Sequence, residues 1–459
     1  MRDRRRTSTS SFGVSGRESH DASAFYDRFR PPEVSDDRTI PPPARVAEPF
    51  QRGDARDMGA VDDGSVALVV TSPPYFAGKV YEAELERDGV PSSYLEYLTL
   101  LTEVFTECVA KLEPGGRIAV NVANLGRRPY RSLASDVISI LERDLGLLLR
   151  GEIIWQKGEG ANGSCAWGSY RSASNPVLRD VTERVIIASK GRFDRSLSVK
   201  DRSSRQLPSE STVSTDDFLA LTLDVWSIPP ESARRVGHPA PFPVELPAQL
   251  IRLLTFRDDL VLDPFMGSGS TLVAASMLGR RYIGYDLDPE YVELARTRVA
   301  EEGTPLAEDT DGRSSGARCL EALSEAGFTV EATEKRVAKT AVAVDALARD
   351  QAGVLWHVEF GGAATAHRPG LNRPDAVFRS LGRLSALRGR LGPHAPLLLL
   401  TTAAPASGSE AETVLRASGS SLVTDVIDVT RPLDRARLDA YAAGKPWPQA
   451  GFWSASELG

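Results

Sequence analysis

Short apolar runs rich in β-branched residues alternate with stretches of helical spacing along much of this chain. Such runs are typical of buried strands, and apolar residues at a period of about 3.6 are typical of amphipathic helices. The alternation predicts an α/β fold, a Rossmann-like, doubly wound and mostly parallel sheet with helices on both faces. Strands are expected at 66–70, 117–122, 151–155, 185–188, 260–262 and 282–285, and helices at 94–112, 247–255 and 271–278.

Breaks in this pattern divide the chain into a tail, two folded units and a linker. Residues 1–45 are rich in Ser, Arg, Asp and Pro without periodicity, so we expect them to be disordered. A core unit is expected at 46–303, a polar linker at 304–315 and a smaller C-terminal α/β unit at 316–459. With 459 residues and 41% hydrophobic content, the chain can form both cores. Strands of the second unit are expected at 354–360 and 397–401.

The strongest cofactor signal is LVLDPFMGSGST at 260–271, where a strand leads through a glycine turn into a helix. Gly267 and Gly269 would let a ligand approach the backbone, and the start of the helix supplies free N–H groups. The motif lacks the Lys of a phosphate-binding loop, and Asp263 would repel phosphate but suit a cationic amino group. Asp286 closes the next strand, where a doubly wound sheet places a ribose-binding carboxylate.

The strongest catalytic signal is the run Ser72, Pro73, Pro74 and Tyr75 at the end of an apolar strand. The prolines fix φ and leave the preceding carbonyls in set directions. An exocyclic amine is a poor nucleophile because its lone pair is delocalised into the ring. A hydroxyl and a carbonyl that accept its two N–H bonds would localise that pair and stabilise the developing charge. Tyr75 can stack on a base flipped out of the duplex, so the run predicts direct methyl transfer to such an amine.

These two motifs resemble the amino-methyltransferase family of DNA modification enzymes, in the permuted order of its β group, over roughly residues 47–300. The resemblance implies S-adenosylmethionine as cofactor and double-stranded DNA as substrate. It implies target-recognition loops within about 156–235, and it includes Lys157 and Glu183 in the stretch between catalysis and recognition. The cofactor-binding residues that it implies are Asp54, Pro241, Phe242, Asp263, Pro264, Phe265, Gly267, Gly269, Thr271 and Asp286.

The target base is indicated by the first residue of the catalytic motif. In the resembled family, Ser at this position usually accompanies methylation of cytosine N4, and Asp or Asn that of adenine N6. Ser72 therefore favours cytosine N4, with adenine N6 as the alternative. Methylation of RNA or of a protein amide, and a DNA-binding protein that has lost catalysis, are further alternatives.

The cysteines exclude other chemistry. Methylation at cytosine C5 needs a thiolate that normally follows a proline, and none of Cys108, Cys165 and Cys319 does. Their wide separation also disfavours zinc sites and disulfides, so no metal site is expected.

Charge limits where DNA can bind. The formal net charge of −7 argues against indiscriminate binding of polyanions, so a DNA surface must be a local basic patch. Candidates are the stretch 190–205 and the group Arg127, Arg128 and Arg131, while the polar stretch 196–217 is expected to be a long surface loop. Without a membrane span or secretory signal the protein is expected in the cytoplasm. A cognate restriction endonuclease is a candidate partner, and monomer and homodimer stay open.

The C-terminal unit carries an acidic pair. Asp345 and Glu359 resemble the acids of restriction-type nucleases, but Gly361 stands where that fold normally places a lysine. We therefore expect a small α/β unit for DNA contact, partner binding or stability, with a methyltransferase and nuclease fusion as the alternative. His357 and His367 are expected to be structural.

Overall fold

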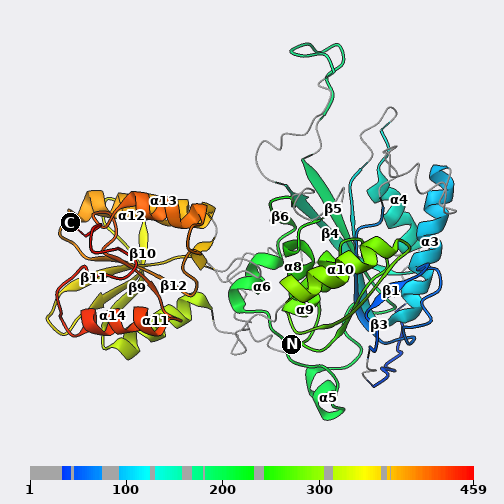
Figure 1. Cartoon of the computed structure of the whole chain (residues 1–459), viewed down its shortest axis with the longest axis horizontal. Helices are drawn as coiled ribbons and strands as arrows, with labels where there is room; N and C mark the ends of the chain where they lie inside the picture. The colour runs from blue at the N-terminus through cyan, green and yellow to red at the C-terminus, as the bar shows by residue number, and fades with distance from the viewer. Residues whose placement is uncertain are drawn as a thin grey trace, which may run out of the picture.

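The described residues of the computed structural model form two sheets, one of eight strands in the first unit and one of five in the C-terminal unit (Figure 1). Each sheet has its own hydrophobic clusters, and no residue of one unit's clusters belongs to those of the other. The structure describes residues 34–42, 46–74, 93–124, 130–157, 168–178, 181–231, 242–303, 314–362, 370–372 and 374–458.

The eight-stranded sheet has the order β1-β8-β7-β2-β3-β5-β4-β6. Neighbouring strands are parallel from β1 through to β3 and between β4 and β6, whereas β5 runs antiparallel to both of its neighbours. The expectation of a mostly parallel sheet is confirmed. The strands are β1 (Phe50–Arg52), β2 (Val66–Thr71), β3 (Leu112–Val122), β4 (Leu148–Gln156), β5 (Thr182–Ser189), β6 (Val225–Ser227), β7 (Leu260–Asp263) and β8 (Arg281–Asp286).

Helices cover both faces of this sheet, each with its own buried cluster. A capping box between Ser93 and Glu96 starts α3, whose apolar positions Leu101 and Phe105 are fully buried. One face carries α3 (Tyr94–Lys111), α4 (Leu133–Ser139) and the π-helical η2 (Ile140–Asp144), and the other carries α8 (Glu245–Leu254), α9 (Ser270–Met277) and α10 (Pro289–Glu302).

Two sequence expectations for this unit are wrong in part. The stretch 196–217 holds the short helix α5 (Val199–Ser204) and the start of α6 (Thr215–Leu221) instead of a structureless loop. Strand β3 begins directly after α3 and runs through the Pro-Gly-Gly sequence at 114–116, where we expected an interruption. Gly115 allows this continuity because it adopts a φ of 78°, which few other residues tolerate.

The N-terminal tail is not disordered throughout. Residues 34–42 lie against the core, where the Ser35 backbone N–H donates to the Gly191 carbonyl at 2.6 Å. The Arg38 Nε also donates to the Ser196 carbonyl at 3.0 Å. The expected boundary at residue 46 therefore lies too late, while 1–33 and 43–45 lie outside the described residues.

The five-stranded sheet has the order β13-β12-β11-β10-β9, with β9 to β11 antiparallel and β11 to β13 parallel. Both strands expected here are confirmed as β11 and β12. The elements are α11 (Ser315–Ala326), β9 (Thr329–Arg336), β10 (Ala343–Arg349), β11 (Leu355–Phe360), η3 (Gly370–Asn372), α12 (Pro374–Leu391), β12 (Leu397–Thr401), α13 (Glu410–Ser418), β13 (Asp425–Asp428) and α14 (Pro432–Ala442). None of the helices described in either unit is long and apolar enough to cross a membrane.

Candidate active site

The two sequence motifs meet at one edge of the large sheet. Strands β2 and β7 are parallel neighbours, so their carboxyl ends lie together. Thr71, the last residue of β2, donates its hydroxyl hydrogen bond to Asp263 Oδ1 at 2.7 Å, across 192 positions of sequence. Ser72 follows directly, and the catalytic and cofactor motifs are therefore adjacent, as ligand sites are in open α/β sheets.

Asp263 is a fully buried carboxylate with spare hydrogen-bonding capacity. Its Oδ1 also accepts from the Phe265 backbone N–H at 3.1 Å, whereas Oδ2 has no hydrogen-bond partner within the described part of the chain. Burial raises the pKa of Asp263 to about 6. An orphaned buried acceptor is costly, and it fits the cationic amino group of the methionine part of S-adenosylmethionine.

The glycine turn after β7 requires glycine for its backbone conformation and for its close packing against α10. Gly267 and Gly269 have φ values of 46° and 78°, and a Cβ on Gly269 would lie 2.8 Å from the Ala295 Cβ of α10. Asp286 holds this turn, because its Oδ2 accepts from the Gly267 N–H at 3.0 Å and its Oδ1 from the Asp288 N–H at 2.9 Å. A carboxylate has about four acceptor positions, so capacity for ribose hydroxyls is left on Asp286.

Asp54 lies beside the end of β8, where the Gly53 N–H donates to the Asp286 carbonyl at 3.0 Å. Its carboxylate is paired with Arg56 at 2.6 Å, and this guanidinium lowers the pKa of Asp54. The side chain is only about 39% exposed, so a ligand would share it with Arg56.

The other residues predicted for the cofactor have different placements. Thr271 is fully buried, donates to the Val70 carbonyl at 3.3 Å and lies close enough to Asp263 to lower the pKa of that carboxyl, so its predicted role in the cofactor site stays a prediction. Pro264 is buried, Phe265 and Phe242 are half-buried against the two clusters of the unit, and Pro241 lies outside the described residues.

Ser72 is half-buried, and its hydroxyl donates to the main-chain carbonyl of Asn121 at 3.2 Å. A hydroxyl has one proton and two lone pairs, so donation to a carbonyl leaves the oxygen able to accept. Pro73 is buried and Pro74 half-buried, while Tyr75 lies outside the described residues. The residues of the motif that the structure describes can thus present a fixed acceptor.

The sequence analysis missed one residue beside Ser72. Asn121, near the end of β3, is 2% exposed, and its Nδ2 donates to Glu183 Oε2 at 2.6 Å. Glu183 also forms an ion pair with Lys157, whose ammonium lies 5.1 Å from the centre of the Trp155 ring. Glu183 and Lys157 had been noted only through the family resemblance. A usable signal was present, since Asn121 is a polar residue inside an apolar strand that ends beside the catalytic one.

A family model described as DNA methylase matches residues 66–297, just over half of the chain. This chain belongs to the DNA methylase family. Membership confirms the predicted amino-methyltransferase and S-adenosylmethionine as its cofactor. The permuted motif order agrees with the sheet, in which β2 precedes β7 in sequence and lies beside it. The matched segment ends before the C-terminal unit.

Relatives of this DNA methylase include Type II methyltransferases. The enzyme M.MjaI of Methanocaldococcus jannaschii is 30% identical over 280 residues, which cover 54% of this chain and 89% of the relative. The enzyme M.BglI of Bacillus subtilis is 28% identical over 308 residues, covering 54% and 85%. A solved structure described as a DNA modification methylase of Thermus thermophilus, complexed with S-adenosyl-L-methionine, is 31% identical with a TM-score of 0.40, covering 55% and 92%.

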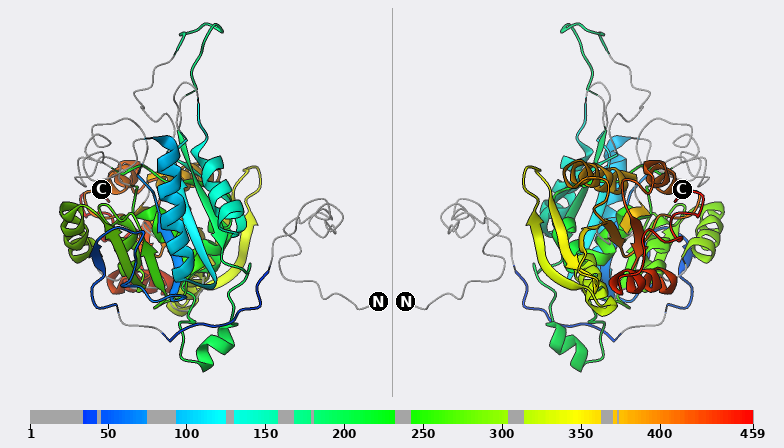
Figure 2. Two further views of the ribbon diagram at one scale, coloured as in Figure 1. Left: turned by 90° about the vertical axis from the view of Figure 1, so that its right-hand side faces the viewer. Right: turned by 90° about the vertical axis from the view of Figure 1, so that its left-hand side faces the viewer.

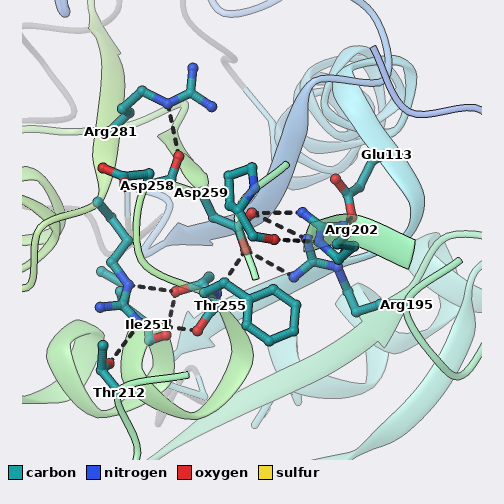
Figure 3. Close-up of polar contacts among 12 residues, drawn as sticks. Glu113, Arg195, Arg202, Thr212, Ile251, Thr255, Asp258, Asp259 and Arg281 are labelled. Carbon is teal, nitrogen blue, oxygen red and sulfur yellow. Dashed lines mark hydrogen bonds and ion pairs between the residues drawn. The ribbon is translucent and has the colours of Figure 1, made fainter. Parts of the chain in front are cut away.

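The opposite edge of the DNA methylase sheet holds a buried ion network (Figure 3). Glu113 at the start of β3 and Asp259 before β7 are both 2% exposed. Arg195 lies 2.7 Å from Glu113 and 3.0 Å from Asp259, and Arg202 lies 3.1 Å and 3.0 Å from the same two acids. Both guanidiniums also lie 5.2 Å from the centre of the Phe256 ring.

This network argues against one candidate DNA surface. The basic stretch 190–205 lies at the amino ends of the parallel strands, away from Ser72. Two of its members, Arg195 and Arg202, already form buried ion pairs. Lys190 donates to the Leu112 carbonyl at 2.7 Å, which leaves Lys200 and Arg205 as its exposed basic residues. The stretch therefore stabilises the base of the sheet.

The second candidate patch is described only in part. Arg131 forms an ion pair with Asp136 and lies 5.5 Å from the centre of the Tyr94 ring. Arg127 and Arg128 lie outside the described residues.

Residues 168–178, which lie between β4 and β5 in sequence, form a small hairpin that projects beyond the sheet (Figure 2). The hairpin is held by a bridge between Gly168 and Pro176 and by the Asn175 N–H donating to Ser169 Oγ at 2.7 Å. Tyr170 is 71% exposed on this hairpin, beside the exposed Arg171.

The acidic pair of the C-terminal unit is neutralised internally. Arg383 of α12 forms ion pairs with Glu359 and, at 3.5 Å, with Asp345. Burial and the neighbouring Asp345 raise the pKa of Glu359 to about 8. A Cβ on Gly361 would lie 2.7 Å from the Leu371 side chain, so the nuclease-type lysine would not fit there. These contacts disfavour the nuclease alternative.

The remaining candidates are structural within the described residues. Cys108 and Cys319 are buried free thiols whose pKa burial raises, and Cys165 lies outside the description. His357 is half-buried with a lowered pKa, and His367 is not described. No group of three or more His, Cys, Asp or Glu side chains in the described ranges could hold a metal ion.

Proposed function

We propose that this DNA methylase transfers the methyl group of S-adenosylmethionine to N4 of cytosine in double-stranded DNA. One observation supports this most directly. The Ser72 hydroxyl donates a hydrogen bond to the Asn121 main-chain carbonyl, close to the Asp263 carboxylate, whose Oδ2 has no hydrogen-bond partner among the described residues. An acceptor for the target amine and an acceptor for the cofactor's amino group are then adjacent.

Ser72 Oγ and the carbonyl at Pro73 accept the two N–H bonds of the target amine in this proposal. Their pull localises the nitrogen lone pair and stabilises the positive charge that develops on nitrogen. When bound, S-adenosylmethionine would supply a methyl group on a positively charged sulfur. The amine nitrogen would bond to that methyl carbon as the carbon–sulfur bond breaks, the sulfur would leave as a neutral thioether, and the nitrogen would then lose one N–H proton to solvent. Tyr75 stacks on the base after it leaves the duplex.

The cofactor lies along the carboxyl edge of β7 and β8 in this proposal. Asp263 binds the methionine amino group, and the turn at Gly267 and Gly269 gives close backbone approach. Asp286 accepts from the ribose, and Asp54 contacts the adenine side. Phe265 and Phe242 contribute apolar walls, with Pro264 fixing the turn.

We also propose that the loops within 156–235 recognise the target and that the chain is paired with a restriction endonuclease. The projecting hairpin and the Type II methyltransferases among the relatives support these two points. We propose further that 316–459 is a separate folding unit serving DNA contact, partner binding or stability, since it has its own clusters.

The decisive experiment identifies the product. Purified protein is incubated with methyl-labelled S-adenosylmethionine and plasmid DNA, and the digested nucleosides are separated chromatographically. We expect label in N4-methylcytosine. Label in N6-methyladenine would overturn the choice of base, and label only in RNA or protein would overturn the substrate class. Label in no nucleic acid, with a relative of known activity positive in parallel, would favour a catalytically lost DNA-binding protein.

A further inference from the structure

The Asn121 side-chain amide lies between Ser72 and Glu183, and only its NH2 group forms hydrogen bonds with described residues. Its Nδ2 donates to Glu183 Oε2 at 2.6 Å and lies 3.4 Å from Ser72 Oγ. A carboxylate only accepts hydrogen bonds, so this contact fixes which end of the amide faces Glu183. Asn121 Oδ1 is buried and has no hydrogen-bond partner within the described residues.

Glu183 is the anchor of this arrangement. It lies on β5, 5% exposed, between the Asn121 amide from β3 and the Lys157 ammonium that follows β4. Each of three adjacent strands thus contributes one polar side chain at the edge where Ser72 lies. A buried carboxylate is tolerated only with such partners, and Lys157 supplies the compensating charge.

We propose that Glu183 is a positioning residue for the methyl-transfer step, acting on Ser72 through Asn121. This inference rests on the proposed function. Glu183 accepts a hydrogen bond from the Asn121 side-chain amide and so fixes its orientation. The Asn121 main-chain carbonyl accepts from the Ser72 hydroxyl, and the Asn121 amide N–H donates to Ser72 Oγ. The remaining lone pair of Ser72 Oγ is thereby kept toward the target amine.

Loss of this hold has a specific consequence. If the Asn121 amide rotates, its unpartnered Oδ1 becomes an alternative acceptor for the Ser72 proton, and the hydroxyl turns away from its productive direction. Misplacement of a reacting group by about 1 Å can cost on the order of a hundredfold in rate. The effect falls on the transfer step, because none of these side chains belongs to the proposed cofactor surface.

The test compares two isosteric changes of buried glutamates, Glu183→Gln and Glu113→Gln. Glu113 is also buried and ion-paired, but at the opposite edge of the sheet. Single-turnover transfer at saturating cofactor is expected to fall at least tenfold in Glu183→Gln, with the cofactor Kd within twofold of the parent. In Glu113→Gln the midpoint of urea unfolding falls, while transfer per folded molecule stays within twofold. Equal transfer rates in the two variants would overturn the inference.

A double-mutant cycle checks that Glu183 acts through Ser72. In a Ser72→Ala background, Glu183→Gln is expected to lower transfer by less than twofold further, because there is no hydroxyl left to orient. A full tenfold loss in both backgrounds would contradict the proposed route. If transfer by Ser72→Ala falls below detection, Asn121→Ala takes its place in the cycle.

These variants also separate the two proposals. Undiminished transfer by Ser72→Ala would refute the proposed function itself. Slow transfer by Ser72→Ala together with parental transfer by Glu183→Gln would refute only the positioning role.

Discussion

The two ends of strand β3 both carry buried charged and polar groups, yet they are built differently. At the amino end Glu113 and Asp259 face two arginines, and each guanidinium lies within 3.1 Å of both acids. At the carboxyl end Asn121 Oδ1 has no hydrogen-bond partner among the described residues, and the same holds for Asp263 Oδ2 at the carboxyl end of β7, two strands away.

This difference distinguishes a structural network from a site. Buried polar groups nearly always have hydrogen-bond partners, so a buried group without one either destabilises the fold or awaits a ligand. At the amino end the two acids and two arginines pair with one another without any ligand and fix the segment 193–210 to the base of the sheet. Arg117 Nε and Ser196 Oγ beside them have no hydrogen-bond partner among the described residues. At the carboxyl end, the cationic amino group of S-adenosylmethionine would supply the missing partner of Asp263 under the proposed function.

The largest effect is expected from a substitution in the ion network at the amino end. Arg202→Met leaves two buried acids with Arg195 alone and should lower the free energy of unfolding by about 3–5 kcal/mol, as measured by urea denaturation. Transfer per folded molecule should not change. The control is Arg205→Met, an exposed position at the end of the same helix, which should change stability by less than about 0.5 kcal/mol. A transfer defect in Arg202→Met without loss of stability would remove the distinction between the two ends.

The next effect concerns the pH dependence of the carboxyl end. The pKa of Asp263 is raised from 3.8 to about 6, so the folded protein binds more protons than the unfolded chain between these values. The contribution of Asp263 to stability should therefore fall as pH rises from about 4 to about 6, by on the order of 2–3 kcal/mol, and then stay level. Asp263→Asn should remove this fall, as measured by unfolding at a series of pH values without cofactor.

Cofactor binding should show the opposite trend with pH. A cationic amino group binds the ionised Asp263, so the Kd for S-adenosylmethionine should rise about tenfold for each pH unit below about 6. Asp263→Asn should bind weakly with no such slope. A slope retained in this variant would assign the proton to another group.

The fold and the site residues could be predicted from sequence where a local pattern determined the structure. The runs that form β2, β7 and β8 and the glycine turn before α9 were recognised because apolar character, turn chemistry and one acid fall within a dozen residues or so. The helix α5 was missed although Ser198 caps it locally by accepting from the Asp201 N–H, and its Arg202 pairs with Glu113, 89 positions away. Asn121 was missed because its proposed role depends on a hydrogen bond to Glu183, which lies on another strand.

A smaller effect compares glycines at the two ends. Gly115 and Gly269 share a φ of 78°, and a Cβ on either would clash, with the Asp194 carbonyl at 2.1 Å or with Ala295 at 2.8 Å. Each alanine variant should lose about 1–3 kcal/mol of stability, more at Gly115 because its neighbour is backbone. Only Gly269→Ala should weaken cofactor binding, measured by calorimetry. Equal cofactor Kd values in the two variants would show that the turn at Gly269 does not contact the ligand.

The smallest effect tests which end meets DNA. Lys200 and Arg205 are exposed at the amino end, whereas Arg171 is exposed on the projecting hairpin. If DNA binds at the carboxyl end, Arg171→Ala should weaken duplex binding by about three- to tenfold and lower the slope of log Kd against log salt by about 1. The double variant Lys200→Ala with Arg205→Ala removes two charges and should change neither quantity beyond twofold. A larger loss in the double variant than in Arg171→Ala would move the DNA to the base of the sheet, where a flipped base could not reach Ser72, and the proposed division between the two ends would fail.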